Sequence, residues 1–156
     1  MRATKRGSRP RADLAEQHGD RRYVLEDQVG YILRQVSQRH AMIFVELIGS
    51  DITPTQWAVM AKPHEVGPTS QNLLGRLTSM DAATIKGVVD RLAKRHLVES
   101  LADATDSRRL IIGLTDEGVQ LVNKLLPTAH RITEVTLSPL SASERVELLK
   151  LLGKMR

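Results

Sequence analysis

Residues 69–99 read TSQNLLGRLTSMDAATIKGVVDRLAKRHLVE, and DATDSRRLIIGLT follows at 103–115. Within the first segment, four apolar side chains recur at the i, i+3, i+4 and i+7 spacing of one helix face: Ile85, Val88, Val89 and Leu92. Asp81 stands directly before this pattern, where an aspartate serves as a helix N-cap. The pattern therefore predicts an amphipathic helix that starts after Asp81.

The other face of this helix is small near its start and basic towards its end. It carries Ala82, Ala83, Thr84, Lys86, Gly87, Arg91 and Lys94. Small residues allow a helix to approach base edges closely, and cations favour phosphates, so this face suits a DNA major groove. An ordinary solvent-facing helix has a similar composition, and the flanking segments decide between the two interpretations.

A shorter helical pattern precedes this helix, and two β-rich runs follow it. Thr69 is expected to cap the first pattern, and the turn 78–80 gives helix–turn–helix spacing. Residues 97–102 and 109–114 predict strands around the charged segment 103–108. A β-hairpin directly after a helix–turn–helix is a wing.

Composition limits the other possibilities. A chain of 156 residues is about one domain in length and can bury a core. We expect no membrane span and no signal peptide, and with no cysteine the expected location is cytoplasmic. The five histidines lack metal-ligand spacing and no nucleophile or phosphate-loop motif appears, so we expect neither an enzyme nor a cofactor.

The positive charge lies mainly in an N-terminal arm. Residues 1–22 hold seven basic and three acidic side chains, so the arm carries +4 of the net charge of +5. Such a flexible arm either contacts the phosphate backbone or is simply solvated.

Long helical patterns lie on both sides of the predicted winged segment. The first runs from Tyr23 to about Gly49. Thr53 and Gln56 form a capping box with Pro54 at the first helical position, and Pro63 is expected to end or kink the helix that begins there.

The C-terminal part is expected to be helical as well. Thr115 caps one pattern, which Pro127 is expected to interrupt, and Ser141 with Glu144 forms a second capping box. The terminal helices carry more apolar surface than one small winged domain covers, which predicts a homodimer.

Several of these motifs together resemble the MarR (multiple antibiotic resistance regulator) family. They are Thr53 with Gln56 and Trp57, the helix pair, VDRL at 89–92 with Leu97 and Val98, DSRR at 106–109 and LTDEG at 114–118. The resemblance covers about residues 25–155, and D-x-R-R followed by L-T-x-x-G is its most specific part.

The resemblance implies a mainly α fold with a small β-hairpin wing. A winged helix–turn–helix at 51–115 would bind DNA, and 23–50 with 116–156 would form a helical dimerisation region from both termini. Such homodimers usually repress from a pseudo-palindromic double-stranded operator and are released by a small effector, here aromatic or an aromatic acyl-CoA. The alternatives are a winged-helix protein-interaction module and a ligandless architectural DNA-binding protein.

The chain departs from the family pattern at several positions. His96 stands where glycine is usual, Pro63 replaces an apolar residue, and Gly87 stands where many members carry arginine. We therefore expect base contacts from Ala83, Thr84 and Lys86. The full set of expected DNA contacts is Thr69, Ser70, Ala83, Thr84, Lys86, Arg91, Lys94, Ser107, Arg108 and Arg109, with Asp106 structuring the wing through Arg108.

The resemblance also implies an effector cleft between the first helix and the winged domain. Five side chains either line this cleft or belong to the core: Arg39, His40, Phe44, Trp57 and Met60.

Overall fold

The computed structural model describes residues 23–103, 106 and 109–156. Residues Met1–Gln35 and Val36–Arg156 form two compact units. In the first unit, a 3-10 turn at Leu25–Asp27 precedes helix α1, Val29–Ile48, which continues into the second unit. The expected first helix thus begins six residues later than the sequence pattern predicts.

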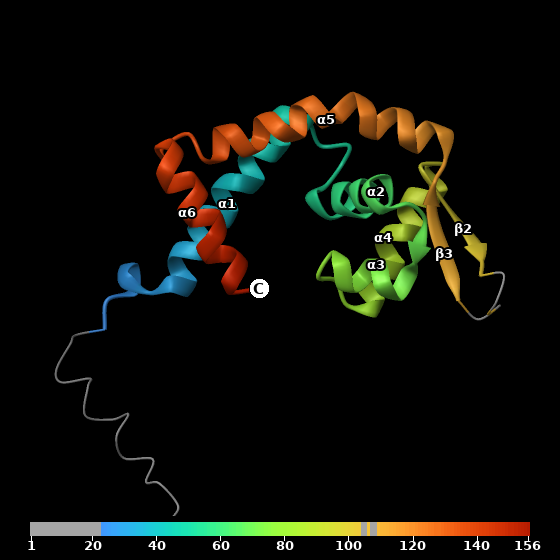
Figure 1. The fold of residues 1–156 in the computed structure, drawn as a ribbon, viewed down its shortest axis with the longest axis horizontal. Coiled ribbons are helices and arrows are strands. Elements are labelled where there is room, and N and C mark those ends of the chain that lie inside the picture. The colour runs from blue at the N-terminus through green and yellow to red at the C-terminus, as the bar shows by residue number, and fades with distance from the viewer. Residues whose placement is uncertain (1–22, 104–105, 107–108) are drawn as a thin grey trace, which may run out of the picture. The chain divides into compact units, whose positions relative to one another are not determined.

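The second unit contains the predicted winged helix–turn–helix (Figure 1). Its elements follow in the order α2 (Pro54–Val66), β1 (Thr69–Ser70), α3 (Gln71–Leu77), α4 (Ala82–Lys94), β2 (Val98–Ala102) and β3 (Leu110–Leu114). Two further helices complete the chain, α5 (Asp116–Thr136) and α6 (Ala142–Lys154). The fold is mainly α with a small wing, as predicted.

Side-chain caps fix the starts of these helices. The Thr53–Gln56 and Ser141–Glu144 capping boxes both form, and Asp81 accepts from the Thr84 backbone N–H at 2.7 Å. Thr69 is not the cap of α3, because it lies in β1 and pairs with Ile112 of β3. Ser70 takes that role and accepts from the Leu73 N–H.

The wing is a three-stranded antiparallel sheet in the order β1-β3-β2. The short strand β1 was not predicted, because its pairing with β3 joins residues far apart in the sequence. The LTDEG motif fixes how α5 leaves the sheet. Thr115 caps α5 by accepting from the Gly118 N–H, and a Cβ added at Gly118 would lie 2.0 Å from the Leu97 carbonyl oxygen. Only glycine fits there.

Neither internal proline ends its helix. α2 continues through Pro63 to Val66, and α5 is continuous through Pro127. The expected end of α2 at Pro63 and the expected interruption at Pro127 were therefore wrong, while a kink at Pro63 stays a prediction. A proline removes one backbone hydrogen bond, and the surrounding structure can outweigh that loss. Pro63 is itself buried, so its ring gains packing, whereas Pro127 is exposed and water can reach the backbone beside it.

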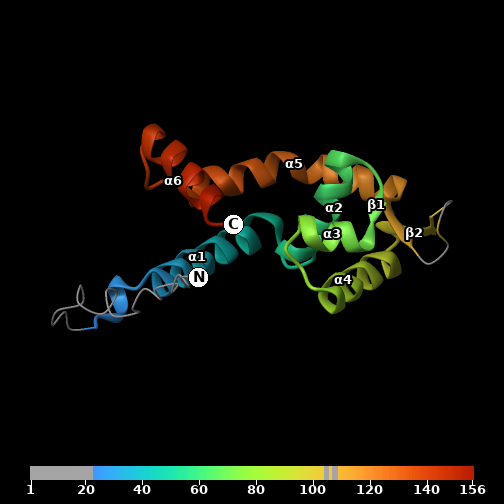
Figure 2. The ribbon, with the colours of Figure 1, turned by 60° about the horizontal axis from the view of Figure 1, so that its bottom comes forward.

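The main core joins the helix–turn–helix to the wing and α5. Its fully buried members include Val59, Met60, Leu74, Leu92 and Ile112. A second, smaller core joins α1 to α5 through Ile43, Phe44 and Ile132, with Trp57 of α2 packed against it. The turned view in Figure 2 shows α3 and α4 side by side.

Candidate nucleic-acid interface and ligand cavity

Helix α4 presents a polar face that the core does not use. Its buried side chains are the four of the predicted stripe, Ile85, Val88, Val89 and Leu92. The expected DNA contacts on the other face are exposed: Ala83, Thr84, Lys86, Arg91 and Lys94. The structure thus brings these five residues together on one accessible surface.

The polar side chains of this face are not equally available. Lys86 Nζ lies 2.6 Å from Asp90 Oδ2, one turn later, and the Thr84 hydroxyl donates to the Asp81 carboxylate. The Thr84 backbone N–H, followed by that hydroxyl, lowers the pKa of Asp81. Within the described part of the chain, Arg91 and Lys94 make no hydrogen bond or ion pair. On this face of α4, Arg91 and Lys94 are therefore the basic side chains that remain free for a partner.

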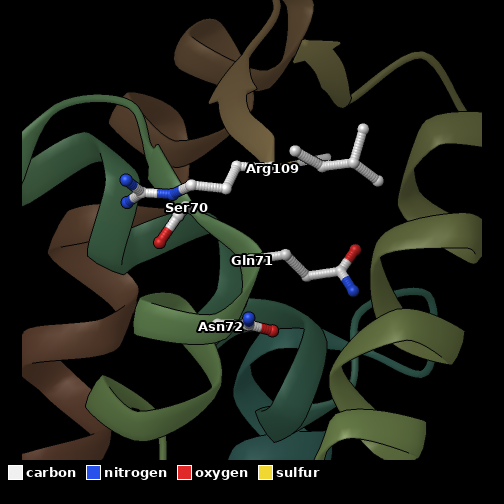
Figure 3. A pocket seen from close by; sticks show the side chains of 5 residues that line it. Ser70, Gln71, Asn72 and Arg109 are labelled. Atoms are coloured by element: carbon white, nitrogen blue, oxygen red, sulfur yellow. The ribbon is translucent and has the colours of Figure 1, made fainter. Parts of the chain in front are cut away.

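A polar hollow of about 100 Å³ lies between the start of α3 and the base of the wing. It is lined by Ser70, Gln71, Asn72, Arg109 and Leu110. Figure 3 shows the Arg109 guanidinium close to Ser70, with the Gln71 side chain extending away from it. Amide and guanidinium groups donate hydrogen bonds, which suits a phosphate oxygen. The sequence analysis missed Gln71 and Asn72, because polar residues in a short helix carry no signal beyond solvent exposure.

The wing itself is described in part. Arg109 Nε lies 3.8 Å from Asp103 Oδ2, and its backbone N–H donates to the Asp106 carbonyl at 2.9 Å, so this arginine is held at the base of the tip. Ser107 and Arg108, and with them the expected Asp106–Arg108 pair, lie outside the described residues, as does the basic arm 1–22. Thr69 and Ser70 are both buried in β1, and of the two only Ser70 lines the hollow.

A separate cavity of about 180 Å³ lies among α1, α2 and α5. It is lined by His40, Phe44, Trp57, Ala129, Ile132 and Thr133. Three of the five expected effector residues therefore meet at one cavity. The other two lie elsewhere: Met60 is fully buried in the main core, and Arg39 donates to the Thr136 and Val135 carbonyls at 2.6 and 3.0 Å, where a cation complements the end of α5.

His40 is the ionisable side chain on the described cavity wall. Its Nδ1 lies 2.9 Å from the Thr136 hydroxyl, which fixes the ring against α5. Nε2 has no hydrogen-bond partner among the residues that the structure describes. A small aromatic ligand could therefore stack on Phe44 and Trp57 while a polar group meets this nitrogen.

The described residues contain no cluster of side chains that could hold a metal ion. In the same part of the chain, no helix is both long enough and apolar enough to cross a membrane. The fold and its exposed basic helix define a winged helix–turn–helix DNA-binding protein.

Comparison with known proteins agrees with this class. The MarR family model matches residues 52–110. The HTH-type transcriptional repressor NicR of Pseudomonas putida is 39% identical over 134 residues, which cover 85% of this chain and 85% of NicR. The chain belongs to the MarR family, and it is a transcriptional repressor of that type rather than an enzyme.

Two solved structures are similar over nearly the same span. A probable transcriptional regulator from Pseudomonas aeruginosa is 48% identical, with a TM-score of 0.81 over 85% of this chain and 100% of that one. BpsR of Bordetella bronchiseptica is 36% identical, with a TM-score of 0.83 over 86% of this chain and 96% of BpsR. The BpsR structure concerns regulation of its DNA binding by 6-hydroxynicotinic acid.

Proposed function

We propose that this chain is a homodimeric repressor that leaves a pseudo-palindromic operator when a small aromatic carboxylic acid binds beside Trp57. Residues 51–115 bind DNA, and residues 23–50 and 116–156 form the dimer. The observation that carries the proposal is the cavity of about 180 Å³ whose walls come from α1, α2 and α5. Helix α2 lies in the proposed DNA-binding segment 51–115, whereas α1 and α5 lie in the proposed dimerisation region.

On DNA, α4 of each subunit enters a major groove. Ala83 and Thr84 lie near the start of this helix, where recognition helices contact base edges, and Lys94 lies at its end, near the phosphate backbone. The hollow formed by Ser70, Gln71 and Arg109 receives a backbone phosphate. The sequence-based expectation that Ser107 and Arg108 contact DNA concerns residues outside the described part of the chain. Phosphate contacts supply most of the affinity, and the base contacts supply preference.

The proposed effector class rests on BpsR, whose DNA binding is regulated by 6-hydroxynicotinic acid. The cavity suits one ring of this size, with aromatic walls at Phe44 and Trp57 and a hydrogen-bonding group at His40. Its volume of about 180 Å³ is too small to enclose a coenzyme, which favours the free aromatic acid over the acyl-CoA thioester.

Release follows from where the ligand sits. Trp57 lies in α2, whereas Phe44 and Ile132 belong to α1 and α5. A ligand that touches all three side chains therefore fixes the DNA-binding segment 51–115 relative to the dimerisation helices. In the ligand-bound arrangement, the two recognition helices of the dimer would be separated by a distance that does not match the two half-sites of the operator. Ligand and DNA then bind different states of the protein, so each weakens the binding of the other.

The test is a fluorescence anisotropy titration of the protein on DNA flanking its own coding region, with and without 6-hydroxynicotinate. His40→Ala should raise the effector concentration needed for release by about ten-fold or more, because a hydrogen bond to a charged group contributes roughly 1.5–3 kcal/mol. His64→Ala is the matched control, since His64 pairs with Asn123 on the surface and lines no part of this cavity.

Two results would count against the proposal. If His40→Ala and His64→Ala were released from DNA at the same effector concentration, the cavity beside His40 would not be the effector site. Loss of DNA binding by His40→Ala without effector would mean that His40 supports the fold instead.

A further inference from the structure

We propose that Arg91 reads a guanine in each operator half-site across the space left by Gly87. The inference rests on the proposed function and names the side chain that supplies sequence preference. It moves this role away from Lys86, where the sequence pattern placed it.

Gly87 lies at the centre of the DNA-facing side of α4. At 100° per residue, the buried residues Ile85, Val88, Val89 and Leu92 occupy one side, and Ala83, Gly87 and Lys94 lie nearly opposite. With a methyl group at Ala83 and none at Gly87, the middle of this face has no bulky side chain of its own.

The Arg91 side chain covers this space. A Cβ added at Gly87 would lie 3.5 Å from Nη1 of Arg91, and apart from the adjacent residues and the backbone of the helix itself no other heavy atom of the described residues lies within 4 Å. The guanidinium therefore lies over the preceding turn, which is the direction that helical side chains favour. The guanidinium of Arg91 thus covers the surface of the helix at Gly87.

The neighbouring polar groups are already engaged. Lys86 pairs with Asp90 at 2.6 Å, and the Thr84 hydroxyl donates to Asp81 at 3.1 Å. Arg91 has no hydrogen bond or ion pair with any residue that the structure describes, and its side chain is exposed. Of the polar side chains on this part of α4, Arg91 keeps all its donors for a partner.

The chemistry selects the base. A guanidinium presents parallel N–H donors in a planar fork, and in the major groove guanine presents two acceptors, O6 and N7, that match it. Adenine offers one donor and one acceptor at the same edge, so it cannot replace guanine without losing a bond. Each half-site should therefore contain one base pair at which guanine is strongly preferred.

The experiment starts from a randomised duplex library, from which wild-type protein selects its consensus. Anisotropy then measures affinity for that consensus and for duplexes with single base pairs replaced. Wild type should prefer guanine at one position per half-site by roughly ten- to a hundred-fold. Arg91→Ala should lose the preference at that position and keep the others.

Two variants of Gly87 provide the matched control. Gly87→Ala places a methyl group at an ordinary contact distance of 3.5 Å and should keep the guanine preference. Gly87→Leu fills the space that the guanidinium uses and should lose it, as Arg91→Ala does. Lys94→Ala should weaken all duplexes alike, because a phosphate contact carries no sequence information.

The outcomes separate the two proposals. A guanine preference that survives in Arg91→Ala, or a consensus without such a guanine, overturns the role of Arg91 and leaves the repressor function standing. A wild-type protein that selects no consensus at all overturns both.

Discussion

At the scale of single residues, Ser79 and His96 bend the chain where glycine is the usual choice. Their φ angles are +55° and +56°, in the left-handed region. After His96, the Leu97 N–H donates to the Leu92 carbonyl at 3.1 Å, while the His96 N–H donates to Ala93 at 2.9 Å. These are the two bonds of a Schellman motif, and Ser79 closes α3 in the same way.

His96→Gly should raise the free energy of unfolding by ~1 kcal/mol, because a left-handed backbone costs about that much for a residue with a Cβ. Ser79→Gly should act in the same direction. Urea unfolding monitored by circular dichroism measures both. Gly67→Ala is the control with the opposite sign, since Gly67 has φ +84° and any side chain there is strained. A midpoint unchanged by both glycine substitutions would show that the surroundings already compensate for the left-handed turns.

At the scale of elements, the capped starts of α2, α4, α5 and α6 could be predicted, and the effects of the prolines could not. A cap is a local signal, because the side chain at Thr53, Asp81 or Ser141 bonds to a backbone group three residues away. The fate of Pro63 depends on what packs around it, and the position of β1 depends on a distant strand. Local sequence contains neither of these facts.

The candidate site divides in the same way. The basic face of α4 follows from helical periodicity, so the sequence could predict it. Pairing of Lys86 with Asp90 and the placement of Arg91 over Gly87 depend on the choice of rotamers along the helix. The sequence also could not distinguish His40, Phe44 and Trp57, which line the cavity, from Met60, which lies in the core.

The cap of α4 gives the recognition helix a dependence on pH. The Thr84 N–H and hydroxyl lower the pKa of Asp81 below its ordinary value of 3.8. A lowered pKa means that the carboxylate stabilises the fold above that ordinary value, and that this contribution is lost as the pH falls through the lowered value. Stability of the wild type should therefore fall more steeply below about pH 4 than that of Asp81→Asn.

Asparagine is the informative replacement because it caps a helix about as well as aspartate and does not titrate. Urea unfolding at a series of pH values measures the difference between the two proteins. Glu144 titrates in the same range, since the Ser141 N–H and then its hydroxyl lower its pKa, but it is present in both proteins and cancels. Parallel pH curves would exclude a contribution from Asp81.

At the scale of the whole molecule, the terminal helices leave apolar side chains uncovered. Helix α6 buries no residue, and Val146 and Leu149 on it are 70% and 56% exposed. On α1, Met42 and Val45 are 73% and 51% exposed. Exposed apolar side chains in this number on a monomer indicate a protein partner, and a second copy covers them most simply.

We therefore expect sedimentation velocity to show a dimer at micromolar concentration. Val146→Glu combined with Leu149→Glu should give a monomer, because a charge buried without a partner in an apolar interface is strongly unfavourable. Neither side chain contributes to the two buried cores, so the circular dichroism spectrum should not change. Val66→Glu is the matched control: Val66 is 53% exposed at the end of α2, outside the terminal helices, and the variant should remain a dimer.

The monomeric double variant should bind a full operator more weakly and with a shallower salt dependence, since one subunit neutralises fewer phosphates than two. A wild-type monomer, or a double variant that still sediments as a dimer, would place the dimer interface elsewhere or exclude it.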